Sequence, residues 1–231
     1  MSVTTDAFEA AAMLRERIMS GELAPGMRLQ QIPLSESLGI SRTPLREALA
    51  HLARDGLLEY EPNRGYAVRT FRWADIEQAY AVRARLEALA CHLCARQGLR
   101  PDAAERLRAC LRRGDTILAG GRLTPEGLPP YRAMNVEFHE TILAAAGNRW
   151  IGDFVRQTQN VPLASDRLFV WRDFDVIKRS HDDHHRIVHA ILERDAQRAE
   201  ALMREHVVFA GEVLEKIVRE GALPGWRFED M

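Results

Sequence analysis

The chain has 231 residues, of which 46% are hydrophobic, enough to build one large domain or two small ones around a packed core. Its formal net charge of −1 excludes a uniformly basic surface for nucleic acid. No apolar run approaches the ~18 residues of a membrane span, the N-terminus lacks a signal-peptide pattern, and three cysteines do not make a disulfide framework. We therefore expect a cytoplasmic protein with no membrane partner.

The first expected element is an amphipathic helix over residues 8–20, ended by Gly21. A short helix over residues 34–38 precedes the segment GISRTPLREAL at residues 39–49. In that segment Gly39 suits a tight turn, Ser41 suits a helix N-cap, and Pro44 is tolerated in the first helical turn. Two helices joined by a tight turn are predicted here.

The second of these helices has two different faces. Leu45, Leu49 and Leu52 recur at helical spacing and are expected to point inward. Arg42, Thr43 and Arg46 then lie on the outer face near the helix N-terminus. This is the layout of a recognition helix in a helix-turn-helix, where arginine pairs with guanine and threonine contacts a phosphate or a thymine methyl group. An ordinary capped helix with solvated arginines is the alternative for the spacing alone.

Two short strands are expected next, near residues 57–60 and 66–68, because apolar and polar residues alternate there. The turn between them carries Arg64 and Gly65 at its tip, as a DNA-binding wing would. Residues 1–70 contain eight arginines, no lysine and nine acidic residues. DNA affinity must therefore come from clustered arginines, and a footprint this small favours a dimer that doubles the phosphate contacts.

Four segments together resemble the winged helix of GntR-family transcription regulators: PGMRL at 25–29, LGISRTPLREAL at 38–49, DGL at 55–57 and RGYAV at 64–68. The resemblance covers roughly residues 8–70. It implies an N-terminal winged helix-turn-helix that binds double-stranded operator DNA through Arg42, Thr43, Arg46, Arg64 and Gly65. We place this DNA-binding domain at residues 1–72.

From residue 74 onward only helical patterns are found, over about 74–97, 101–119, 130–146, 148–165, 173–193 and 196–219. The fold class is therefore mainly α, a winged helix-turn-helix followed by an all-helical bundle at residues 73–231. The linker at residues 71–75 is short and apolar, so we expect the two domains to be held at a defined angle.

Polar residues interrupt the apolar stripes of these helices. Asn135 and His139 share a stripe, while His185 and His206 lie on two others; Arg83, with Glu87 four residues later, lies on a fourth. Each alone could be a satisfied core residue or a simple ion pair. Three inward histidines with an oxygen donor on separate helices also suit zinc, nickel or manganese.

The same helices resemble the FCD effector domain of the FadR-type GntR subgroup. The matching segments are RARLE at 83–87, EFH at 137–139, AGN at 146–148, HHRI at 184–187 and His206. In that domain an aspartate and three histidines hold a divalent metal, which implies Asn135, His139, His185 and His206 as ligands here. Asn135 stands where aspartate is usual, and His184 where an acidic residue is usual; a shift of one residue would exchange His184 with His185.

The expected function is that of a ligand-responsive transcription regulator and repressor, not an enzyme. It would bind a palindromic operator as a homodimer and sense a small carboxylate at the metal, with Arg83 binding the effector. Zinc is the favoured ion. Two alternatives are a regulator that senses the metal itself, and a metal-dependent hydrolase built on a helical bundle.

Overall fold

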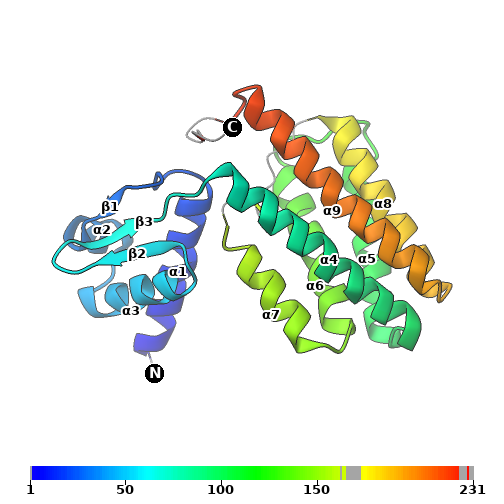
Figure 1. The fold of residues 1–231 in the computed structure, drawn as a ribbon, viewed down its shortest axis with the longest axis horizontal. Coiled ribbons are helices and arrows are strands. Elements are labelled where there is room, and N and C mark those ends of the chain that lie inside the picture. Colours follow the sequence, from blue (N-terminus) through cyan, green and yellow to red (C-terminus); the bar gives the residue numbers. More distant parts are fainter. Residues whose placement is uncertain (1, 162, 165–172, 224–227, 229–231) are drawn as a thin grey trace. The chain divides into compact units, whose positions relative to one another are not determined.

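The computed structural model describes residues 2–161, 163–164, 173–223 and 228. The chain divides into two compact units (Figure 1). The first comprises residues 1–76 with 160–163 and 223–231, and the second comprises residues 77–159 with 164–222. None of the helices in the described part of the chain is long and apolar enough to cross a membrane.

The first unit contains three helices and a small antiparallel sheet. The helices are α1 (Ser2–Met19), α2 (Gln31–Leu38) and α3 (Arg42–Arg54), and the strands are β1 (Arg28–Leu29), β2 (Leu58–Glu61) and β3 (Gly65–Val68). The strand order is β1-β3-β2, with Tyr60 of β2 opposite Tyr66 of β3. Both predicted strands are present; β1, only two residues long, has no alternation to predict it.

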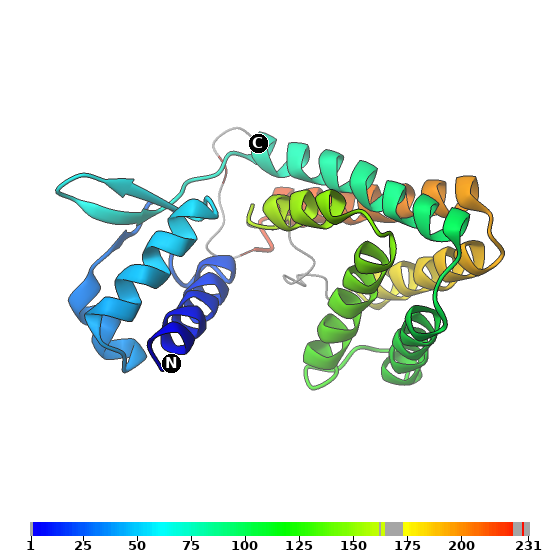
Figure 2. The same ribbon diagram turned by 90° about the horizontal axis from the view of Figure 1, so that it is seen from below.

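Helices α1 and α3 lie side by side in this unit (Figure 2). Their contact buries Leu14 and Ile18 of α1 against Leu45, Leu49 and Leu52 of α3, all of which are fully inaccessible to solvent. Burial of a leucine-sized side chain contributes roughly 1.5–3 kcal/mol. The apolar stripe of α3 therefore anchors the helix and leaves its opposite face exposed.

The turn between α2 and α3 depends on Gly39. This residue has φ +65°, a left-handed conformation that glycine adopts without a steric penalty, and its N–H donates to the carbonyl of Glu36. Ser41 occupies the N-cap position of α3 in an extended conformation, but its side chain makes no capping hydrogen bond. The turn is therefore set by glycine, and the expected side-chain cap is not formed.

The second unit is built from helices. They are α4 (Trp73–Gln97), which begins in the first unit, α5 (Pro101–Leu118), α6 (Leu128–Ala145), α7 (Arg149–Thr158), α8 (Phe174–Leu192) and α9 (Ala196–Arg219). Helix α5 packs on α6 and α8, and α8 packs along α9 (Figure 1). Their shared core includes Leu107, Tyr131, Met134, Phe138 and Ile142.

Several predicted boundaries differ from the structure. In the first unit α1 begins at Ser2 and not at residue 8, and α2 begins at Gln31 and not at residue 34. Helix α6 begins at Leu128, because Pro129 and Pro130 fit its first turn, where no N–H is needed. The helix predicted over 148–165 ends at Thr158. Proline at position 162 supplies no N–H to continue a helix; positions 162 and 165 themselves lie outside the described residues.

Helices α5 and α8 approach closely at Gly114. A β-carbon at this position would lie 2.7 Å from both ring nitrogens of His181, and closer still to Cε1. Both residues are buried. Glycine is therefore required here by space and not by backbone conformation.

We expect Gly114→Ala to destabilise the helical unit. Alanine gains roughly 1 kcal/mol of helix propensity, but a methyl group overlapping the His181 ring costs about 1–3 kcal/mol. Thermal unfolding followed by circular dichroism should show a lower midpoint. Gly120→Ala is the control, since nothing lies within 4 Å of that position. An unchanged or raised midpoint for Gly114→Ala would contradict the close packing.

Candidate functional sites

The first turns of α3 present the residues predicted to contact DNA. Arg42, Thr43 and Arg46 are exposed, on the face of the helix opposite its buried leucines. Neither Arg42 nor Arg46 forms an ion pair with any residue that the structure describes. Both guanidinium groups are thus available to an external partner, which is the arrangement a recognition helix needs.

The turn between β2 and β3 forms the predicted wing. Gly65 has φ +80°, and Arg64 beside it has a side chain that is 70% exposed. Glu61 lies 3.5 Å from Arg64 and 2.9 Å from Arg28, and hydrogen bonding from Arg28 lowers the pKa of this carboxyl group. The longer contact leaves Arg64 only loosely held, at the tip of an exposed hairpin.

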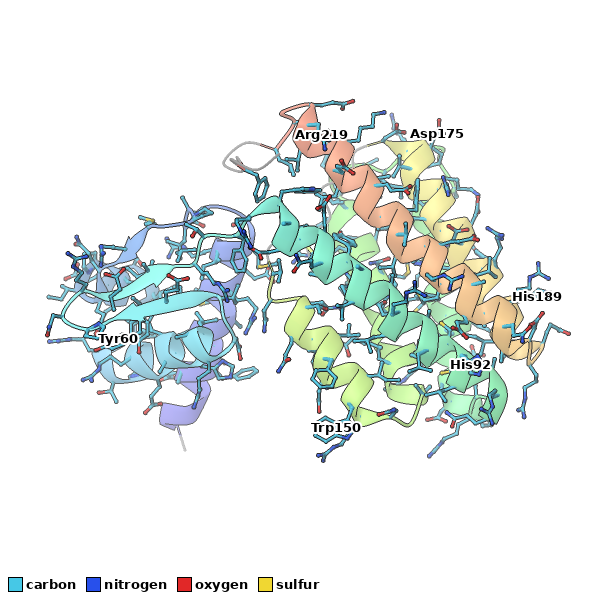
Figure 3. The ribbon with its side chains drawn as sticks, viewed as in Figure 1. Tyr60, His92, Trp150, Asp175, His189 and Arg219 are labelled. Carbon is cyan, nitrogen blue, oxygen red and sulfur yellow. The ribbon has the colours of Figure 1, made fainter. Side chains whose placement is uncertain are left out.

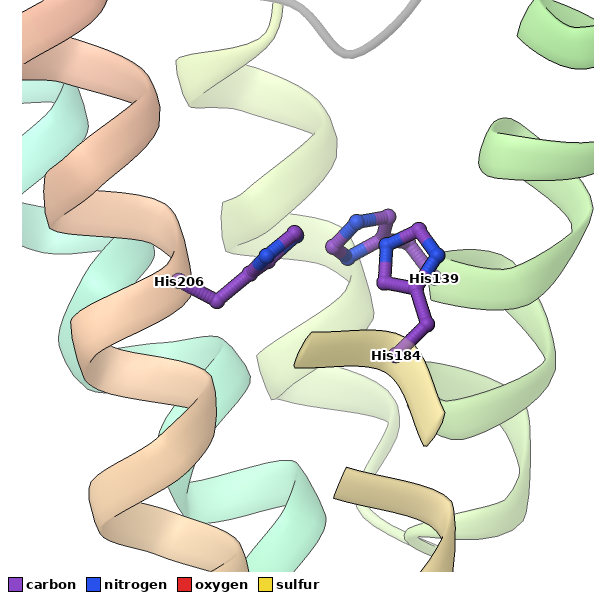
Figure 4. A group of neighbouring side chains, drawn as sticks. All are labelled: His139, His184 and His206. Carbon is purple, nitrogen blue, oxygen red and sulfur yellow. The ribbon is translucent and has the colours of Figure 1, made fainter. Parts of the chain in front are cut away.

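Three histidines from three helices meet inside the second unit. His139 of α6, His184 of α8 and His206 of α9 are all buried, and each offers a ring nitrogen within 4.8 Å of the others (Figure 4). The ring centroids of His184 and His206 are 4.8 Å apart, and His139 lies 5.4 Å from His206. The predicted convergence of histidines on the bundle core is therefore present.

His185 is not part of this cluster, so the assignment of this residue to the core site is off by one position. Its ring nitrogen instead lies 2.8 Å from Asp115 of α5, and its side chain is 42% exposed. The buried stripe of α8 runs through Ile177, His181, His184 and Ile191. The sequence pattern aligned His185 with Val188, which is buried, and with Leu192, which is only half-buried; the spacing from Ile177 selects His184 instead.

Glu87 of α4 holds His139 in place. One carboxylate oxygen lies 2.7 Å from Nδ1 of His139, and the other accepts a 2.9 Å hydrogen bond from Nε of Arg83. Burial alone would raise the pKa of Glu87, but Arg83 and His139 outweigh it and lower the pKa to about 2. An ionised Glu87 favours the tautomer with the proton on Nδ1, which leaves Nε2 of His139 as an acceptor or ligand.

Sequence reasoning paired Glu87 only with Arg83 and missed its contact with His139. The i, i+4 spacing within α4 is visible in the sequence. The contact with His139 joins residues 52 positions apart and depends on how α4 packs against α6. Only the three-dimensional structure could reveal it.

The other two histidines have buried nitrogens without partners. Neither ring nitrogen of His184 has a hydrogen-bond partner among the described residues, and Nδ1 of His206 has none there either. Burial lowers the pKa of His184 well below its usual value and that of His206 to about 3, so both rings are neutral. Buried, unpaired polar atoms cost stability. Neutral imidazole nitrogens that face one another fit a divalent metal ion.

The two remaining predicted residues are also buried. Asn135 lies one helical turn before His139 on α6. Arg83 is 4% exposed, donates to Glu87 and to the carbonyl of Ala164, and lies over the ring of Tyr80. Arg83 is thus built into the network around the histidines.

Comparison with known proteins agrees with this architecture. Residues 7–68 match the family model of the gntR family of bacterial regulatory proteins, and residues 78–209 match that of the FCD domain. An HTH-type transcriptional regulator from the TAR-I ttuE–ttuC′ intergenic region of Agrobacterium vitis is 33% identical over 142 residues, which cover 58% of this chain and 76% of the relative. The HTH-type transcriptional repressor GlaR of Escherichia coli is 25% identical over 212 residues, covering 89% and 94%.

Solved structures share the fold. McbR/YncC of E. coli superposes with a TM-score of 0.74 at 20% identity, covering 92% of this chain and 98% of the other. A GntR regulator from Rhodococcus sp. RHA1 has a TM-score of 0.64 at 24% identity, with the same coverage. These domains and relatives are transcription regulators, which excludes the hydrolase alternative. The chain belongs to the GntR family of DNA-binding transcription regulators and carries an FCD domain in its C-terminal part.

Proposed function

We propose that this regulator binds a palindromic operator as a homodimer and responds to a small carboxylate at a metal site among α4, α6, α8 and α9. It would act in the cytoplasm as a repressor. The observation that carries the metal-dependent part of the proposal is the group of three buried histidines, of which His184 and His206 are neutral and have unpartnered nitrogens. The DNA-binding part depends on the exposed arginines of α3 and the wing.

The arginines divide into two roles in this proposal. Arg42 and Arg46, near the start of α3, would enter the major groove and pair with base edges, while Thr43 would contact a phosphate or a thymine methyl group. Arg64, next to Gly65 at the wing tip, would contact a phosphate or the minor groove. A domain with few cations gains affinity when two copies bind two half-sites.

We expect Arg46→Ala to weaken binding to the specific operator by ~1–3 kcal/mol, because a base contact is lost. Fluorescence anisotropy with operator and scrambled duplexes measures the effect. Arg54→Ala is the matched control, since Arg54 is an exposed arginine at the opposite end of the same helix. Equal weakening on both duplexes would instead make Arg46 a phosphate contact.

The proposed dimer has a candidate surface on α4 and α9. Val82 and Leu89, seven residues apart on α4, are 46% and 41% exposed, and Val208 of α9 is 44% exposed. The two helices lie side by side (Figure 1) and are linked by His92 and Glu200 at 2.8 Å. A second copy of the chain would cover these apolar side chains. The resulting dimer would carry two winged helices, one for each half-site of the operator.

Sedimentation equilibrium at micromolar concentration should show a dimer. Val82→Glu together with Leu89→Glu should shift it toward monomer by burying charge at the interface. Phe154→Glu is the control: Phe154 is also an exposed apolar residue, 48% exposed, but belongs to α7, where its ring lies 6.2 Å from that of Trp150. Figure 3 labels Trp150. A wild-type monomer at this concentration would refute the dimer.

His139, His184 and His206 would hold the metal, with Asn135 as a further candidate ligand. Such an ion supplies a Lewis-acidic centre that binds anionic oxygen atoms. Zinc suits imidazole nitrogens best; nickel and manganese are alternatives. The charges of Arg83 and Glu87 cancel, and the rings of His184 and His206 are neutral, so these residues leave the charge of a bound ion uncompensated within the core. That favours an anionic effector such as a small carboxylate.

Arg83 would take part in effector recognition through the Glu87 network. Its guanidinium already contacts Glu87 and the carbonyl of Ala164. An effector carboxylate at Arg83 would have to share or replace these contacts, which also position His139 through Glu87. This connects effector binding to the packing of α4 against α6. Coupling between an effector site and DNA typically amounts to ~1–3 kcal/mol.

We expect His184→Gln to lose the core metal, whereas His189→Gln keeps it, because His189 is exposed on α8. After gel filtration into metal-free buffer, elemental analysis should find one ion per chain fewer in His184→Gln than in the wild type and in His189→Gln. Metal should also raise the unfolding midpoint of the wild type by mass action. An unchanged ion count in His184→Gln would place the core site elsewhere. If metal loading alone changed operator affinity, the ion itself would be the signal, as in the metal-sensor alternative.

A further inference from the structure

A second group of metal-ligating side chains lies between α5 and α8. Asp115 of α5 accepts contacts at one oxygen, Oδ1, from Nε2 of His181 at 3.0 Å and from Nε2 of His185 at 2.8 Å. The candidate ligand atoms of the three residues all lie within 4.8 Å of one another. No residue of this group belongs to the core cluster of His139, His184 and His206.

The local fold directs these side chains toward one point. His181 and His185 are four residues apart, so they project from the same face of α8 toward α5. The absence of a side chain at Gly114 lets the His181 ring approach the backbone of α5 next to Asp115. The His181 side chain is 2% exposed, while those of His185 and Asp115 are 42% and 53% exposed. The group thus has a buried inner side and an outer side open to solvent.

We propose that Asp115, His181 and His185 form a second divalent transition-metal site, separate from the core site. Two imidazole nitrogens and a carboxylate oxygen are a donor set that zinc accepts, with water completing the coordination on the exposed side. Zinc–ligand bonds of ~2.0–2.1 Å at tetrahedral angles separate ligand atoms by about 3.3 Å. The present 2.8 and 3.0 Å separations need to open only slightly. A bound ion would link α5 to α8 close to His184.

Zinc titration of chelator-stripped, full-length protein tests the proposal, with bound metal counted by equilibrium dialysis and elemental analysis. We expect two ions per chain in the wild type. Asp115→Ala and His185→Gln should each bind one, His184→Gln should bind one, and Asp115→Ala combined with His184→Gln should bind none. His189→Gln is the control: His189 is exposed one turn beyond His185 on α8 (Figure 3) and should leave both ions in place.

A second readout uses stability. In the His184→Gln background, zinc should still raise the unfolding midpoint, and adding Asp115→Ala should abolish this shift. Unchanged zinc stoichiometry in Asp115→Ala would overturn the proposal and leave a hydrogen-bonded trio. Loss of an ion in His189→Gln would assign the site to His185 and His189 instead. If the core cluster bound no metal but the second site did, the wild type would bind one ion and Asp115→Ala would remove it. This outcome distinguishes an error in the core-site proposal from an error in the second-site proposal.

Discussion

The buried charge of Glu87 is the constraint on which the core of the helical unit depends. This side chain is 1% exposed, and a carboxylate so buried is unfavourable unless it is paired. Arg83 neutralises it from the same helix, and His139 contacts its second oxygen from α6. Removing either partner would leave an incompletely compensated charge in the core. The pairing therefore restricts how α4 and α6 pack and which way the His139 ring faces.

The histidines around this network are less completely satisfied than the charges. Glu87 and Arg83 have partners, whereas His184 and His206 bury nitrogens that lack them within the described residues. Stability alone would favour apolar side chains at such positions. A core that retains two imidazoles with unsatisfied nitrogens beside His139 carries an unfavourable arrangement that a bound ion would relieve. This is why the cluster supports a ligand site better than a structural role.

Helix α8 is shared by both proposed metal sites. His184 points into the bundle core, while His181 and His185 face Asp115 of α5. Successive residues of a helix are rotated by about 100°, so His184 and His185 point toward different neighbours. The run of histidines in this helix is thus divided by helical geometry. This division also explains why a shift of one residue, from His184 to His185, replaces a member of the core cluster with a member of the group at Asp115.

The first unit shows how much the sequence by itself determined. The leucine spacing of α3, the glycine at the preceding turn and the Arg64–Gly65 hairpin tip are local features, because each depends on residues within a few positions of one another. They correctly predicted a winged helix-turn-helix and its exposed arginines. Helix positions in the second unit were predicted for the same reason, except where prolines moved a boundary.

What only the tertiary structure decided involves partners distant in the chain. Strand β1 is too short to have a pattern and exists because it pairs with β3. The choice of His184 over His185 depends on which face of α8 meets α6 and α9. The Glu87–His139 contact and the Asp115–His181 contact join residues 52 and 66 positions apart. Periodicity predicts that a residue points inward, but packing between helices determines which side chain it meets there.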